Sequence, residues 1–269
     1  VAVAAGNPYA DMMHFTGRVI VADPDPGRRA LYGRLLRKRG FDIDFAVNGP
    51  EVVKLADEAL RLVLTVSDLP PDGASAAWQE FASMGEKIRS VPWLVGGPRE
   101  RPTLAPKGEA RDRAPLRPFD QKDPPENLLF HINELLSPPP PNVRASARLL
   151  YGGQASFRLH GSDEVISAFT YNINRTGVYL RTLAPPPKGT ELTIELRPPH
   201  GEGRAQVTGR AVWCKAPSDK GGPMVPAGMG IVYLRVPVAD GAALEAGYDA
   251  LLAEMPPEGE GDGGGGASD

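Results

Sequence analysis

A run of four prolines, Pro138–Pro141, separates two parts of the sequence that have different patterns. Consecutive prolines adopt polyproline II geometry, which is semi-rigid and joins neither a helix nor a sheet. Helix-like and strand-like segments alternate before the run, whereas short strand-like segments and turns follow it. The sequence therefore predicts two domains. In chain order we expect a flexible lead (1–17), a first domain (18–136) and a proline-rich linker (137–142). A second domain (143–255) and a disordered acidic, glycine-rich tail (256–269) follow.

The first domain alternates apolar strands with helices whose apolar residues recur at helical spacing. The segments Leu62–Val66 and Val91–Val95 are almost continuously apolar, which is typical of strands buried on both faces of a parallel sheet. The helix expected at Gly27–Arg39 is followed by Gly40, a common residue after a helix C-terminus. This alternation predicts an α/β fold with a doubly wound parallel sheet. The other expected strands and helices are Arg18–Ala22, Phe41–Val47, Pro50–Ala59, Ala74–Met84 and Glu126–Leu136.

The second domain is all-β in pattern, with turns such as Pro185–Gly189 and Pro198–Gly201 between its candidate strands. Six short strands at this spacing predict a small closed barrel, since closure removes exposed sheet edges. The segment Ala242–Glu254 has apolar residues on one helical face, which predicts a C-terminal helix packed on the barrel or on a partner. The candidate strands are Gln154–His160, Val165–Ile173, Gly177–Arg181, Glu191–Leu196, Gly203–Trp213 and Met229–Leu234.

The order of elements in the first domain, together with its acidic residues, resembles the receiver domain of response regulators. A receiver holds Mg²⁺ with two adjacent carboxylates after its first strand and accepts phosphate on an aspartate that ends its third strand. Here the first site reads Asp23-Pro24-Asp25-Pro26, so proline takes the place of the second acid. Aligning Leu69-Pro70 with the leucine-proline of the family puts Val66 at the acceptor position. Asp68, two residues further on, could accept phosphate only in a different register.

Other receiver positions are also changed. Arg117-Pro118-Phe119 stands where a lysine normally precedes proline and phenylalanine after the fifth strand, and Gly96 or Gly97 replaces the switch hydroxyl. Too few hard oxygen ligands remain for a Mg²⁺ site. The resemblance therefore implies a degenerate pseudo-receiver domain, with a phosphorylatable receiver as the alternative. The stretch Pro98–Pro115, where the fourth helix would fall, is expected to be a mobile loop.

Two motifs in the second half resemble the signature of the PilZ domain, a small β-barrel that binds cyclic di-GMP. Arg144 and Arg148 stand four apart ahead of the barrel, and Asn172-Ile173-Asn174-Arg175-Thr176-Gly177 reads as a short polar turn between two strands. The resemblance continues over about Val143–Val236 and implies the same barrel. Further matching segments are Gly177–Leu180, Lys188–Leu192, Gly209–Trp213 and Gly228–Ile231.

The ligand that this resemblance implies, cyclic di-GMP, presents two phosphodiester charges and two guanines. Guanidinium groups bond bidentately to phosphate oxygens or to guanine O6 and N7, and they stack on bases. Arg144 and Arg148 would wrap the ligand, while Asn172, Asn174 and Gly177 would contact it from the barrel. Asn174 stands where serine is usual. Asparagine also donates and accepts hydrogen bonds but is bulkier, so it either keeps a base contact or crowds it out.

Two functions follow from these patterns. In the first, the chain is a non-enzymatic bacterial signalling protein that binds cyclic di-GMP and acts on an unidentified protein partner, in motility or a related behaviour. In the second, both domains are degenerate and the chain is a ligand-free adaptor. Arg144 and Arg148 are then solvated linker charges, and Asn172 to Gly177 is a plain β-turn.

Composition argues against other classes of protein. A net charge of −3 gives no general attraction to nucleic acid or to an anionic membrane, and no segment approaches the roughly 20 apolar residues of a membrane span. The single cysteine, Cys214, excludes an internal disulfide and fits a reducing compartment. The four histidines lack metal-ligand spacing, and no pairing of a nucleophile with a base is visible. The sequence therefore predicts a cytoplasmic protein without cofactor, metal or catalytic site.

Overall fold

The computed structural model describes residues 17–97, 115–136, 146–219 and 224–254. These residues form two compact units, one built mainly on residues 17–136 and the other mainly on residues 146–254. Several expected segments fall outside the described residues. They are the lead up to residue 16, the loop at residues 98–114, the linker at 137–142 and the tail at 256–269.

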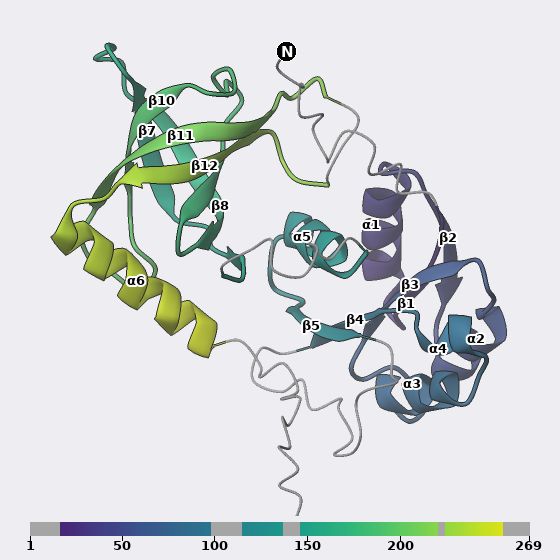
Figure 1. Cartoon of the computed structure of the whole chain (residues 1–269). Helices are drawn as coiled ribbons and strands as arrows, with labels where there is room; N and C mark the ends of the chain where they lie inside the picture. The colour runs from purple at the N-terminus through teal and green to yellow at the C-terminus, as the bar shows by residue number, and fades with distance from the viewer. Residues whose placement is uncertain (1–16, 98–114, 137–145, 220–223, 255–269) are drawn as a thin grey trace, which may run out of the picture. The chain divides into compact units, whose positions relative to one another are not determined.

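The N-terminal unit is a five-stranded parallel sheet in the order β2-β1-β3-β4-β5, with helices on both faces (Figure 1). This order is that of the flavodoxin-like doubly wound fold, to which receiver domains belong. The predicted α/β sheet is confirmed. Its strands are β1 (Gly17–Ala22), β2 (Phe41–Ala46), β3 (Leu60–Val66), β4 (Trp93–Gly97) and β5 (Leu116–Asp120). Its helices are α1 (Pro26–Arg37), α2 (Gly49–Leu55), α3 (Ala74–Ala82), α4 (Glu86–Arg89) and α5 (Pro125–Leu136).

Alternate side chains of the interior strand β1 point to the two faces of this sheet. Ile20 and Ala22 join a core cluster with residues of α2 and α3, whereas Val19 and Val21 join a second cluster with residues of α1 and α5. A strand covered on both faces needs apolar residues at successive positions, which is the pattern that identified the strands in the sequence.

Some boundaries differ from those expected. Helix α2 ends at Leu55 and not at Ala59, because β3 already begins at Leu60. Arg117-Pro118-Phe119 was expected after the fifth strand but lies within β5. Strand β5 is at the edge of the described sheet, and an edge strand tolerates a proline because its unpaired side needs no N–H donor.

The C-terminal unit is a closed antiparallel barrel of six strands in the order β8-β7-β10-β11-β12-β9, with β9 pairing back to β8. The six-stranded barrel predicted from the sequence is confirmed. Its strands are β7 (Gln154–Leu159), β8 (Ile166–Asn174), β9 (Gly177–Arg181), β10 (Glu191–Leu196), β11 (Ala205–Lys215) and β12 (Gly228–Arg235). A two-residue strand, β6 (Leu149–Leu150), was not predicted and adds to the end of β8.

The C-terminal helix α6 (Val238–Ala253), labelled in Figure 1, contacts the barrel. Its contacts are with β11 and β6. Its buried Leu244 and Tyr248 belong to the same apolar cluster as the barrel interior. The helix begins before the expected Ala242, because β12 ends at Arg235 and Gly241 N already donates to Pro237 O at 2.8 Å. Asp240 in the first turn suits the positive end of the helix dipole.

Candidate functional site

The polar turn predicted from the sequence is a two-residue connection between β8 and β9. Asn174 pairs with Gly177, which leaves Arg175 and Thr176 at the tip. The side-chain oxygen of Asn174 accepts a hydrogen bond from Thr176 N at 3.1 Å, the geometry of an Asx-turn. The same oxygen also accepts from Thr176 Oγ1 at 3.4 Å, so the side-chain oxygen of Asn174 supports the turn.

Asn172, Asn174 and Gly177 share the outer face of this hairpin. Ile173 and Val178 form the pair between them and belong to the barrel core, and side chains alternate between faces along a strand. Asn172 is only 7% exposed. Its side chain is therefore a largely covered polar group beside the turn.

The segment that carries the arginines enters the sheet beside this hairpin. Strand β6 pairs with the end of β8, where Leu149 stands opposite Ile173 and Leu150 opposite Asn172. Arg148 directly precedes β6 and is exposed. Arg144 lies outside the described residues. The structure thus places one arginine of the predicted pair next to the polar turn.

Backbone packing by itself explains why residue 177 is a glycine. A Cβ at this position would lie 2.2 Å from Ile231 O of the neighbouring strand β12, far inside any permitted contact. The close approach of β9 to β12 therefore requires glycine here. A ligand is not needed to explain this residue.

The decisive comparison concerns this half of the chain. Residues 142–250 match the family model described as PilZ domain. This part of the chain is a PilZ domain. It belongs with proteins related to cyclic di-GMP signalling, and both PilZ and receiver-like domains are typically regulatory rather than enzymatic.

Three solved structures are similar to parts of the chain, at low sequence identity. The Bacillus subtilis inhibitor of motility, MotI/DgrA, is 17% identical with a TM-score of 0.33, covering 41% of this chain and 52% of its own. The PilZ domain of CeSA from a cellulose-synthesizing bacterium is 11% identical with a TM-score of 0.30, covering 40% and 99%. The chemotaxis response regulator CheY4 of Vibrio cholerae is 17% identical with a TM-score of 0.39, covering 45% and 99%.

The chain thus spans about half of the length of the Bacillus protein. No curated protein matches the sequence. In the described part of the chain, no helix has both the length and the apolar character needed to cross a bilayer.

The tip of the polar turn is joined to helix α6 of the PilZ domain. Arg175 Nη1 donates to Glu245 Oε1 at 2.9 Å and Nη2 to Asp249 Oδ1 at 2.5 Å. Its guanidinium carbon lies 4.8 Å from the ring centre of Tyr248. Sequence reasoning assigned no role to Arg175, although it stands inside the quoted motif, because its partners lie about 70 residues further along the chain.

An aromatic group lies beside Asn172 on the PilZ barrel. Tyr179, opposite Asn172, contacts the rings of Tyr171 at 5.9 Å and Trp213 at 5.7 Å between centroids. Its hydroxyl donates to Pro226 O at 2.7 Å, and burial raises its pKa well above the ordinary tyrosine value. These contacts pack β9 against β8 and β11 beside Asn172.

In the receiver-like unit, Asp23 already has a cationic partner. It is 1% exposed at the end of β1, and both of its carboxylate oxygens accept hydrogen bonds from Arg28. Nε of Arg28 lies 2.7 Å from Oδ2, and Nη2 lies 2.8 Å from Oδ1. Asp25 instead caps α1 by accepting from Arg28 N at 2.9 Å. The guanidinium of Arg28 supplies the positive charge that this buried carboxylate needs.

These residues do not fit a Mg²⁺ site of the receiver type. Val66 ends β3 as a buried apolar residue, and Asp68 is exposed in the loop beyond it. Both oxygens of Asp23 are engaged by Arg28. No group of three or more potential metal ligands occurs among the described residues. Phosphate acceptance at Asp23 or Asp68 therefore finds no support in the local chemistry.

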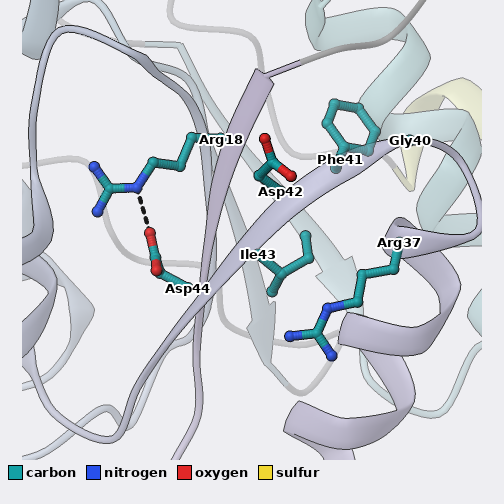
Figure 2. A pocket seen from close by; sticks show the side chains of 7 residues that line it. All are labelled: Arg18, Arg37, Gly40, Phe41, Asp42, Ile43 and Asp44. Carbon is teal, nitrogen blue, oxygen red and sulfur yellow. Dashed lines mark hydrogen bonds and ion pairs between the residues drawn. The ribbon is translucent and has the colours of Figure 1, made fainter.

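A hollow of about 530 Å³ lies along the edge strand β2 of the receiver-like unit (Figure 2). Two arginines and two aspartates are among the residues that line it. Arg18 is paired with Asp44, as Figure 2 shows, and also with Asp57. Arg37 lies over the ring of Phe45, 5.1 Å from its centre. The ion pairs of Arg18 and the ring contact of Arg37 therefore engage both arginines of the lining with residues of the protein.

Proposed function

We propose that the PilZ domain binds cyclic di-GMP on the face formed by residues 144–148, here called the arginine segment, and the β8–β9 turn. The observation that supports this most is the pairing of β6 with β8, because it sets Arg148 beside Asn172 and Asn174. Arg144 and Arg148 would bond to the phosphodiesters or the guanine edges, and Asn172 would contact the ligand from the barrel.

The proposed output is non-enzymatic. Cyclic di-GMP binding would change how the PilZ domain engages a protein partner, in motility or a related bacterial behaviour, from a cytoplasmic location. No step of this proposal involves a metal, a further cofactor, nucleic acid or membrane insertion. The receiver-like unit contributes contacts rather than a second signal, because the groups that would accept phosphate are replaced or already paired.

Calorimetry with cyclic di-GMP at micromolar protein and moderate salt tests the proposal. The wild-type chain should bind one ligand species with measurable heat, and Arg144→Ala with Arg148→Ala should remove it. Two lost charge-assisted contacts correspond to about 3 kcal/mol or more, which is about a hundredfold in affinity.

The matched control removes two arginines from the β10–β11 turn, Arg197→Ala with Arg204→Ala. It changes net charge equally but should leave affinity within about twofold. Absence of heat in the wild type would reject cyclic di-GMP binding. Equal losses in the two double variants would mean that general charge, and not a site, attracts the ligand.

A ligand-free adaptor is the second candidate function, and one observation favours it. The oxygen of Asn174 is used inside the turn, and Asn174 is bulkier than the serine it replaces. Under this alternative the same titration gives no heat. Asn174→Ser then separates two causes, because heat gained by this variant would identify Asn174 as the residue that blocks the ligand.

A further inference from the structure

The arginine segment is held at Ser146 and at Ala147 by hydrogen bonds from two separate elements. Arg175 N in the polar turn donates to Ser146 Oγ at 3.2 Å. The hydroxyl of Tyr248 in α6 donates to Ala147 O at 3.0 Å. The next residue along the chain is Arg148, and β6 begins directly after it. The position of Arg148 is therefore set partly by Tyr248, a residue of the C-terminal helix α6.

Tyr248 is well suited to fix a position. It is 2% exposed, and it packs in the same apolar cluster as the barrel core. The Arg175 guanidinium lies over its ring and is bonded to Glu245 and Asp249, one helical turn apart on α6. Those two ion pairs are exposed, with 39% of the Arg175 side chain accessible, so each contributes little by itself. Of the two residues that bond to the arginine segment, Arg175 and Tyr248, the buried Tyr248 therefore holds it more firmly.

We propose that Tyr248 is a positioning residue of the ligand site, so that helix α6 forms part of that site. This inference rests on the proposed function. The Tyr248 hydroxyl fixes the Ala147 carbonyl and thereby pre-organises Arg148 for its anionic ligand. Pre-organisation lowers the ordering cost that a flexible arginine segment would otherwise carry into binding. Coupling free energies are reciprocal, so ligand binding stabilises the contact between α6 and the segment by the same factor.

The chain offers a matched pair of substitutions for the test. Tyr248→Phe removes only the hydroxyl and keeps the ring in the core. Tyr233→Phe removes another buried tyrosine hydroxyl of the same domain, and that hydroxyl has no hydrogen-bond partner in the described part of the chain. One lost hydrogen bond predicts about fivefold weaker binding of cyclic di-GMP to Tyr248→Phe. Tyr233→Phe should bind as the wild type does. Equal affinities for all three proteins would overturn the proposal.

Hydrogen–deuterium exchange supplies a readout that does not need the ligand. In the unliganded chain, amides of residues 146–150 should exchange about three to ten times faster in Tyr248→Phe than in the wild type or Tyr233→Phe. The exchange rates of amides in β10 and β11 should be the same in all three proteins. Unchanged exchange at 146–150 contradicts the positioning role. If the wild type binds no cyclic di-GMP, the proposed function fails while this measurement still decides whether α6 positions the segment.

A third arm tests the reciprocal effect. Cyclic di-GMP should slow amide exchange in α6 of the wild type, and less so in Tyr248→Phe. Arg175→Lys keeps the charge and the backbone bond to Ser146 but cannot bridge both carboxylates or stack as a plane. It should lower the protection of α6 while residues 146–150 stay protected by Tyr248. Ligand binding without any change in α6 exchange would contradict the coupling.

Discussion

A buried carboxylate needs a counter-charge, and Asp23, directly after β1, takes it from Arg28 in the first turn of α1. The pairing with Arg28 is bidentate, and the backbone N of Asp25 also donates to Asp23 Oδ1 at 2.8 Å. A receiver would use a divalent cation at this place. The receiver-like unit thus carries its cation covalently, as a side chain that cannot dissociate.

Arg28→Ala should destabilise the N-terminal unit by about 2–3 kcal/mol, because it leaves Asp23 buried and unpaired while Arg28 itself is about one third exposed. Arg34→Ala, on an exposed position of the same helix, is the control and should cost less than about 0.5 kcal/mol. Urea unfolding followed by tryptophan fluorescence in a Trp213→Phe background reports only this unit, through Trp78 and Trp93. Similar losses in the two variants would refute the role given to Arg28.

His131 makes the stability of the same unit dependent on pH. Burial, with a smaller effect from Arg117, lowers its pKa from 6.5 to about 3, and its Nδ1 is buried without a partner among the described residues. Between these values the unfolded chain binds a proton that the folded unit does not. Stability is therefore lost as pH falls below about 6.5, by roughly 1–2 kcal/mol between pH 7 and pH 5.

His131→Leu should remove that share of the pH dependence in the same fluorescence assay. His160→Gln changes an exposed histidine of the other unit and serves as the control. A wild-type slope between pH 7 and pH 5 that His131→Leu leaves intact would show that other groups cause it.

At the scale of elements, the hairpin β8–β9 shows how closely backbone packing constrains the polar motif. Gly177→Ala should destabilise the PilZ domain by about 2–4 kcal/mol, because the new Cβ meets the backbone oxygen of Ile231. Gly203→Ala is the control, since a Cβ there would meet nothing within 4 Å. Hydrogen exchange of β9 and β12 measures the effect without ligand. A stable Gly177→Ala domain that fails to bind cyclic di-GMP would instead assign this glycine to the ligand.

Sequence patterns predicted the elements whose signals are local. Strands β9 and β10 were predicted with their observed bounds, since glycine and proline turns mark both ends. The two-residue strand β6 carries no periodic signal and exists only through its pairing with β8. Helix α6 starts earlier than its apolar face suggests, because its first turn is exposed and held by Pro237 and not by packing.

Of the candidate ligand residues, Arg148, Asn172, Asn174 and Gly177 lie close together through the pairing of β6, β8 and β9, and Arg144 lies outside the described residues. The resemblance named these five residues as ligand contacts, and that role stays a prediction. It could not indicate Tyr248, which reaches Ala147 across 101 residues of sequence. A hydrogen bond between segments so far apart leaves no trace in local spacing, so the contribution of α6 required a structure.

At the scale of the whole molecule, the signal is expected to enter through the PilZ domain alone. Cyclic di-GMP affinity measured with Mg²⁺ and acetyl phosphate should equal the affinity measured in EDTA, and phosphate labelling should be absent. The physical reasons are the occupied Asp23 and the apolar Val66. Incorporation of phosphate that Asp68→Asn abolishes would show that the alternative register is used.

The pairing of β8 limits how the arginine segment can travel. One edge of β8 is shared by β7 and β6, and the other edge is taken by β9, so the last residues of β8 are paired on both sides. Leu149 is thus held by pairing directly after Arg148, while the Tyr248 hydroxyl holds the Ala147 carbonyl directly before it. A ligand that displaces Arg148 must therefore break the Tyr248 hydrogen bond or detach β6 from β8. The proposed receptor can respond with only a small displacement of Arg148 unless one of these contacts is lost.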